Sequence, residues 1–144
     1  MLQQKIESKN KFIELVPPTY KTRCNNVCFK LQLNQIMYKI DHYLLENGTD
    51  PFEKWLKELN DIRARAKINV KIDRLSMGNF SSSKPLGGGV SEIKIDYGPG
   101  YRVYYGQSGK FVILLLCGGD KDTQEEDIEI AKNHWADFKR RSVL

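Results

Sequence analysis

The sequence predicts an α+β domain, in which a block of consecutive antiparallel strands is packed by helices. Residues 87–121 contain alternating and apolar runs that are separated by glycine turns. Helical patterns with clear start signals precede this block over residues 50–77. A further helical pattern follows it over residues 123–141. Strands that follow one another between helices are typical of this fold class.

The first two strands of the block alternate with period two, as half-buried strands do. Residues of one parity are apolar or aromatic, and residues of the other parity are mostly charged or polar. The second group comprises Glu92, Lys94, Asp96, Arg102 and Tyr104. We therefore expect one face of the sheet to lie on the core and the other face to expose these side chains. The third strand, residues 111–117, is apolar at every position, which favours a central strand covered on both faces.

Two helices are expected before the strands. The first begins at Asp50, where Glu53 completes a capping box. The second runs from about Asp61 to Met77, and Gly78 supplies a left-handed C-cap.

The helix after the strands has the clearest boundaries. Thr123 and Glu126 form a capping box, and acidic side chains crowd the first turn. Basic residues 139–141 stand at the other end, where they complement the helix dipole. We therefore expect a C-terminal helix that starts at Thr123.

Cations follow one another at helical spacing along one face of the second helix. They are Arg63, Lys67, Lys71 and Arg74. Such a stripe is either a solvated face or a surface for RNA or the ribosome, and both interpretations stay open. Residues 63–110 hold nine basic and three acidic side chains, which predicts a positive surface over the middle of the domain.

Residues 1–36 show no sustained period of 2 or 3.6, although they contribute most of the net charge of +5. We interpret them as a disordered extension. Cys24 and Cys28 are expected to be incidental thiols, because no second pair of metal ligands follows. No leader pattern and no apolar run of membrane-spanning length is present, so we expect a cytoplasmic protein without a membrane partner.

Two blocks of the sequence resemble one known family. The run VSEIKIDYGPGYRVYYG is followed by VILLLCGGDKDTQEEDIEIAKNHWAD. In combination they are similar to the RelE/ParE superfamily of toxins, in its addiction-module killer branch, which is also described as HigB-like or phage Gp49-like. The likeness begins near Met37, which is also a candidate for the true start of the protein.

The resemblance implies a RelE/ParE-like toxin domain over residues 37–144 that opens with a strand at residues 37–43. The implied fold is α+β and RelE-like. It has a small, mostly antiparallel four-stranded sheet packed by two N-terminal helices and one C-terminal helix. The implied activity is that of the toxin of a type II toxin–antitoxin system, an endoribonuclease (mRNA interferase) that works on the ribosome.

RNA can be cut without a metal when its 2′-hydroxyl attacks the adjacent phosphate. The protein must then stabilise extra negative charge on phosphorus, which cations on a rigid sheet can do. Lys94 and Arg102 share the polar parity, and Lys84 and Lys121 arrive from loops at the strand ends. The alternative for Lys94 and Arg102 is a cross-strand ladder of ion pairs with Glu92 and Asp96 that only solubilises an exposed face.

By resemblance, Lys94 and Arg102 match the family positions that bind and polarise the mRNA phosphate, and Lys121 matches the basic residue after the last strand. Glu92 stands where the family has a lysine. It is either a proton acceptor or a structural partner of these cations, and both roles stay open. The candidate catalytic residues are thus Lys94, Arg102, Lys121 and Glu92. The candidate RNA-binding residues are Lys84, Arg74, Lys71, Lys67 and Tyr104, the last by stacking on a base.

The resemblance also implies the partners, which are a small helix-turn-helix antitoxin, mRNA and the ribosome. The proposed chemistry needs neither a metal nor a cofactor. Two other functions stay open. One is a ParE-like DNA gyrase poison without nuclease activity, and the other is an inactive remnant that only binds its antitoxin.

Overall fold

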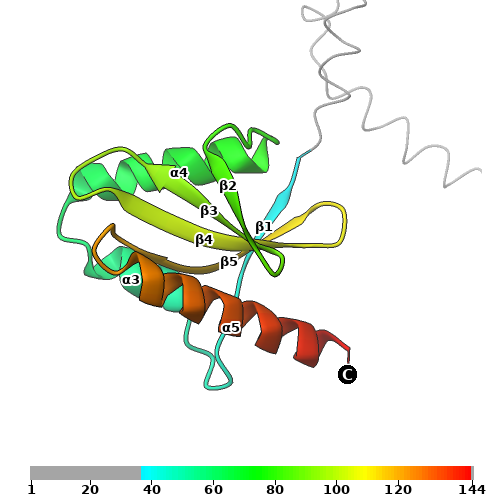
Figure 1. The fold of residues 1–144 in the computed structure, drawn as a ribbon. Helices are drawn as coiled ribbons and strands as arrows, with labels where there is room; N and C mark the ends of the chain where they lie inside the picture. The colour runs from blue at the N-terminus through cyan, green and yellow to red at the C-terminus, as the bar shows by residue number, and fades with distance from the viewer. Residues whose placement is uncertain (1–36, 144) are drawn as a thin grey trace, which may run out of the picture. The chain divides into compact units, whose positions relative to one another are not determined.

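The computed structural model describes residues 37–143, in which a mixed sheet of five strands carries helices on both faces (Figure 1). The elements in chain order are β1 (Lys39–His42), α3 (Pro51–Glu58), α4 (Ile62–Ser76), β2 (Ser83–Gly87), β3 (Val90–Ile95), β4 (Tyr101–Ser108), β5 (Val112–Gly119) and α5 (Gln124–Ser142). The strand order is β1-β5-β4-β3-β2, with β1 parallel to β5 and the other pairs antiparallel. The extension predicted over residues 1–36, with Cys24 and Cys28, lies outside the described residues. None of the described helices is both long and apolar enough to cross a membrane.

The predicted four-stranded, mostly antiparallel sheet is wrong, because the sheet is mixed and has a fifth strand, β2. Residues 83–87 contain a proline and a glycine and do not alternate, so their sequence is typical of a loop. Pro85 is compatible with β2 because this strand lies at the sheet edge and pairs with β3 alone. The middle position, which we expected for the apolar strand β5, belongs to β4.

The predicted helix start at Asp50 is confirmed, whereas the capping box predicted for α5 is wrong. The Asp50 carboxylate accepts a hydrogen bond from the backbone N–H of Glu53 at 2.9 Å. At α5, the Thr123 side chain caps no backbone N–H, and its hydroxyl donates instead to the Asp127 carboxylate at 2.5 Å. This side-chain hydrogen bond links the N-cap residue to the first turn of α5.

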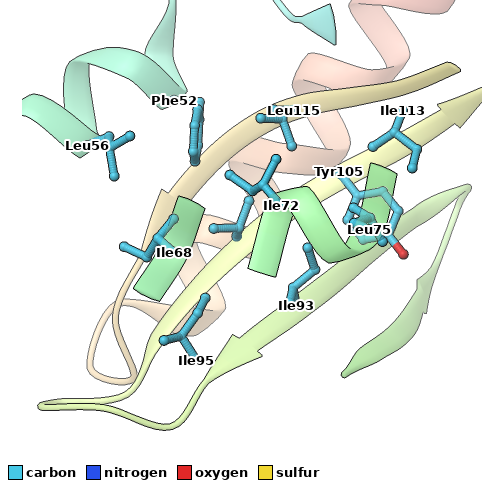
Figure 2. Close-up of a cluster of buried hydrophobic side chains, with 11 residues drawn as sticks. Phe52, Leu56, Ile68, Ile72, Leu75, Ile93, Ile95, Tyr105, Ile113 and Leu115 are labelled. Carbon is cyan, nitrogen blue, oxygen red and sulfur yellow. The ribbon is translucent and has the colours of Figure 1, made fainter. Parts of the chain in front are cut away.

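One face of the sheet packs against α3 and α4 and forms the larger hydrophobic core (Figure 2). Side chains of α4 pack on alternate residues of the strands, which share one parity. The buried members are Phe52, Leu56, Ile68, Ile72, Leu75, Ile93, Ile95, Val103, Tyr105, Ile113 and Leu115. The apolar parity of β3 and β4 is therefore confirmed as a core face.

The other face, which the sequence predicted to be polar and exposed, is covered in part by α5, whereas Lys84 and Lys94 on it stay exposed. Ala131 and Trp135 of this helix pack with Tyr104 and Leu114 in a second buried cluster. Trp135 lies against the backbone of β4, where a Cβ at Gly106 would overlap the indole. The absence of a side chain at this glycine lets α5 approach the sheet closely.

A register shift between β4 and β5 decides which residues of β5 face α5. Leu116 has no partner in β4 and is an extra residue of β5, as in a β-bulge. After this residue the parity of β5 changes, so Gly119 lies opposite Arg102 on the α5 face. A Cβ at Gly119 would overlap the Asp127 carboxylate. The bulge therefore brings the first turn of α5 onto the polar end of the sheet.

Candidate functional site

Strand pairing brings five of the predicted site residues together on the face of the sheet that α5 covers in part. Lys84 on β2 pairs with Glu92 on β3, and Glu92 pairs with Tyr104 on β4. Two residues further along β3, Lys94 pairs with Arg102. Directly paired residues of antiparallel strands project from the same face, with Cβ atoms about 5 Å apart. Lys94 and Arg102 therefore share a face, as their alternation predicts.

Arg102 and Glu92 form a buried ion pair on this face. Each residue is less than a tenth exposed, and Arg102 Nε lies 3.6 Å from Glu92 Oε2. The guanidinium also donates to the Gly100 carbonyl at 3.3 Å. The Gln124 side-chain amide donates to the same Glu92 oxygen at 3.3 Å, so the first residue of α5 is tied to the pair. Because two partners engage this carboxylate, the contacts favour a structural role for Glu92 over that of a proton acceptor.

Tyr104 lies directly across from Glu92 and is fully buried. Its hydroxyl has no hydrogen-bond partner among the described residues. Burial raises the pKa of Tyr104, and the charges of Asp127 and Glu92 raise it further. Burial also raises the pKa of Asp127. The Tyr104 ring is fully buried in this structure and offers no open face on which an RNA base could stack.

Lys94 reaches solvent next to the buried pair. Its Nζ lies 2.7 Å from the Asp96 carboxylate, and both side chains are more than half exposed. The hydrogen bond from Lys94 and its charge hold the pKa of Asp96 below the usual value, and the charges of Lys71 and Arg102 lower it further. The Asp96 carboxylate therefore stands among cations from three elements, β3, α4 and β4.

Lys121 and Lys84 are exposed near the same residues. Lys121 lies in the loop between β5 and α5, beside Gly100 of the turn between β3 and β4. Lys84 lies on the edge strand β2. Neither forms an ion pair within residues 37–143. We define the sheet-face site by these cations and the residues that they adjoin. Its members are Lys84, Glu92, Lys94, Arg102 and Lys121.

The remaining candidate residues lie on α4, against the opposite face of the sheet. A groove of about 410 Å³ between α4 and β3 is lined by Ala66, Lys67, Val70, Lys71, Arg74, Ile95 and Asp96. Lys71 donates to the Ser82 hydroxyl at 2.6 Å, and Lys67 Nζ lies 5.1 Å from the centre of the Tyr97 ring. Neither these lysines nor Arg74 pairs with a carboxylate of the described chain. These cations of α4 therefore form no ion pair within the described chain, although the Asp96 carboxylate lies in the same groove and feels the charge of Lys71.

Sequence reasoning missed Gln124 as a neighbour of the site. The available signal was the position of Gln124 in the chain, because a helix that follows a strand after a loop of four residues begins close to the end of that strand. Which strand residue the Gln124 amide would reach depended on the bulge at Leu116, which the apolar run of β5 concealed.

The histidines hold structural contacts away from the sheet-face site. His42 Nδ1 lies 2.5 Å from the Asp50 carboxylate, and His134 Nδ1 lies 3.2 Å from the Leu116 carbonyl. Burial lowers the pKa of His134. In the described part of the chain, no three His, Cys, Asp or Glu side chains are grouped closely enough to hold a metal ion.

Comparison with known proteins identifies a family for the chain but no function. No protein-family model matches the chain. Over 81 residues the chain is 49% identical to an uncharacterized protein of Haemophilus influenzae, and the match covers 56% of this chain and 82% of that protein. The chain therefore belongs to the same family as the Haemophilus protein. Because that relative is uncharacterized, the functional argument depends on the geometry of the site.

Proposed function

We propose that this protein is the toxin of a type II toxin–antitoxin system and that it cuts mRNA on the ribosome as a metal-independent endoribonuclease. The observation that supports this most is the direct pairing of Lys94 with Arg102 on a sheet, with Lys84 and Lys121 exposed nearby. During cleavage the phosphate gains negative charge, and cations fixed on a sheet stabilise that charge without reorganisation.

In this mechanism Lys94 makes the first contact with the phosphate, because its ammonium is exposed. The phosphate displaces Asp96, whose exposed ion pair with Lys94 is easily exchanged. Arg102 adds its charge from the sheet beneath, where its guanidinium pairs with Glu92, and Gln124 in turn holds the Glu92 carboxylate. The 2′-hydroxyl of the RNA attacks the phosphorus while the bond from phosphorus to the 5′-oxygen breaks, so the nucleophile comes from the RNA and no water is activated. The 2′-hydroxyl proton passes to solvent, and solvent returns a proton to the 5′-oxygen.

The burial of Arg102 favours a second candidate function. The guanidinium is largely shielded from solvent, and Glu92 compensates its charge. A family member that binds its target without cutting RNA would tolerate the same buried pair, since it needs no cation at a phosphate. This alternative includes a ParE-like DNA gyrase poison and an inactive remnant that only binds its antitoxin.

The proposed function also defines where the protein acts and what restrains it. An enzyme that cuts mRNA on ribosomes works in the cytoplasm. The proposed inhibitor is a small helix-turn-helix antitoxin encoded by the adjacent gene. Coexpression of that gene is expected to relieve the growth arrest that the toxin causes when expressed alone.

Cleavage of mRNA by the purified protein, freed of metal by chelation before it is added to intact ribosomes, separates these functions. We expect the wild type to cut mRNA and to leave supercoiling by DNA gyrase unchanged. Lys94→Ala should lose most of the activity. Lys57→Ala on α3 is the matched control, because Lys57 is an exposed lysine in an ion pair with Glu53. Inhibition of gyrase without cleavage, or no effect in either assay, would contradict the proposal and favour the alternatives.

A further inference from the structure

The outer side of α4 exposes an apolar strip for which the proposed ribonuclease has no use. Ile62 is 71% exposed, Val70 is 47% exposed, and Met77 at the C-cap is 46% exposed. Ile62, Ala66 and Val70 follow one another at intervals of four residues, so they lie along one face of the helix. The buried residues of α4 define a different face and comprise Ala64, Ile68, Ile72 and Leu75. The exposed aliphatic side chains therefore do not serve the core.

A strip of cations runs beside the apolar strip. The groove between α4 and β3 joins the two strips, because Ala66 and Val70 line it together with Lys67 and Lys71. We name the combined surface the α4 docking face. Its apolar members are Ile62, Ala66, Val70 and Met77, and its basic members are Arg63, Lys67, Lys71 and Arg74. No described carboxylate forms an ion pair with these basic side chains.

We propose that the α4 docking face binds an acidic amphipathic helix of a partner protein. An apolar stripe at intervals of four residues packs against a matching stripe on a second helix. The unpaired cations along one flank select carboxylates on the corresponding flank of the partner and fix its orientation. Asp73 interrupts the apolar strip between Val70 and Met77, so the partner places its acids along the cationic flank and not over Asp73.

A nucleic acid fits this face less well than an acidic helix does. Phosphates would pair with the cations but would leave Ile62 and Val70 exposed, so no apolar surface would be removed from water. Stacking of a base requires an open aromatic ring. The Tyr97 ring, which adjoins this face, has Lys67 over it. Charge and apolar exposure together therefore point to a protein partner.

Binding of a labelled peptide to the full chain, followed by fluorescence anisotropy, tests this proposal. The probe is a designed helix of about three heptads, with leucine at the a and d positions and glutamate at the e and g positions. A scrambled peptide of the same composition has no apolar stripe and serves as the control. We expect the wild type to bind the amphipathic peptide and not the scrambled one.

Substitutions in the apolar strip then locate the binding. Val70→Glu should weaken binding at least about tenfold, because it places a carboxylate where the partner presents leucine. Ile62→Glu provides an independent second test on the same strip. Ile130→Glu is the matched control, because Ile130 lies on α5 and is 43% exposed, and it should leave binding unchanged. Thermal unfolding of each variant verifies that the exposed substitutions leave the fold intact.

Three results would overturn the proposal. One is the absence of peptide binding, and another is equal binding of the scrambled peptide or of Val70→Glu and Ile62→Glu. The third is binding of a single-stranded oligodeoxynucleotide in place of the peptide. This binding would be lost in Lys67→Glu and unaffected by Val70→Glu. That result would assign the face to nucleic acid. The assay measures peptide binding and involves no RNA cleavage. Absence of peptide binding would therefore count against the docking proposal and not against the proposed ribonuclease function.

Discussion

The sheet-face site and the α4 docking face are both positive, but they handle charge in opposite ways. On the sheet face, Arg102 is buried and paired with Glu92. On α4, Lys67 and Lys71 form no ion pair with other described residues and stand beside exposed aliphatic side chains such as Val70. A cation removed from water needs a counter-ion, whereas a hydrated one does not. A count of basic residues therefore does not locate a binding site, because burial and neighbours decide what each cation can bind.

Of the substitutions that test this contrast, Glu92→Ala is expected to have the largest effect. The change leaves the buried Arg102 charge without its counter-ion and should lower the free energy of unfolding by about 3 kcal/mol. Glu92→Gln keeps the shape and an acceptor oxygen, so it should cost less. Urea unfolding measures both variants. Equal stability of Glu92→Ala and the wild type would show that the pair is hydrated.

Arg102→Ala tests whether the buried cation also acts on the phosphate. Loss of a fixed positive charge beside the developing charge should lower the cleavage rate by about 10²–10³. Arg102→Lys keeps the charge and loses the planar fork, so its rate should lie in between. Single-turnover cleavage of mRNA on ribosomes measures the rates, and circular dichroism checks the fold. An unchanged rate in folded Arg102→Ala would remove Arg102 from the site.

The double substitution Lys67→Ala and Lys71→Ala tests the role of the cations on the α4 docking face. Lys67 and Lys71 are candidate RNA-binding residues by sequence, but they lie on the face opposite the sheet-face site, so cleavage of mRNA should change by less than about twofold. Binding of the acidic amphipathic peptide should weaken in the same variant, and a salt titration should show that the remaining affinity depends less on ionic strength. A large loss of cleavage would instead extend the RNA surface onto α4.

Tyr104→Phe is expected to have the smallest effect at neutral pH. The hydroxyl has no partner among the described residues, so its removal should change stability by less than about 1 kcal/mol. The pKa of Tyr104 is raised in the folded protein, so above about pH 10 the unfolded tyrosine loses its proton first. The unfolded state then binds fewer protons, and wild-type stability falls as the pH rises.

Urea unfolding at about pH 9 and about pH 11 measures this alkaline loss. The fall should be smaller in Tyr104→Phe than in the wild type. Some fall should persist, because burial raises the pKa of Cys117 to about 12, and this shift has the same sign. An identical pH dependence in both proteins would mean that the Tyr104 hydroxyl reaches water.

Sequence reasoning succeeded for most features that depend on neighbours in the chain, although the capping box predicted at Thr123 is absent. Alternation placed Ile93 and Ile95 on the core face, and the side chain of Asp50 identified a helix start. It failed where distant segments meet. β2 pairs through backbone groups despite Pro85, so no side-chain pattern marks it as a strand.

The same limit applies to the sheet-face site. Parity predicts that Lys94 and Arg102 share a face, but it does not predict what covers that face. The extra residue Leu116 reverses the parity of β5 and brings the first turn of α5 onto the polar end of the sheet. The burial of Arg102 and the contact between Gln124 and Glu92 belong to this tertiary arrangement, which no local pattern encodes.

The chemistry of the RNA ends produced by the purified protein tests the proposed function most directly. With metal-free protein, intact ribosomes and mRNA, attack by the 2′-hydroxyl leaves a 2′,3′-cyclic phosphate on the upstream fragment and a 5′-hydroxyl on the downstream fragment. We expect these ends from the wild type and a much slower appearance of the same ends with Lys94→Ala. Intact mRNA, or fragments that end in a 3′-hydroxyl, would contradict a mechanism in which cations on the sheet hold the phosphate during attack by the RNA itself.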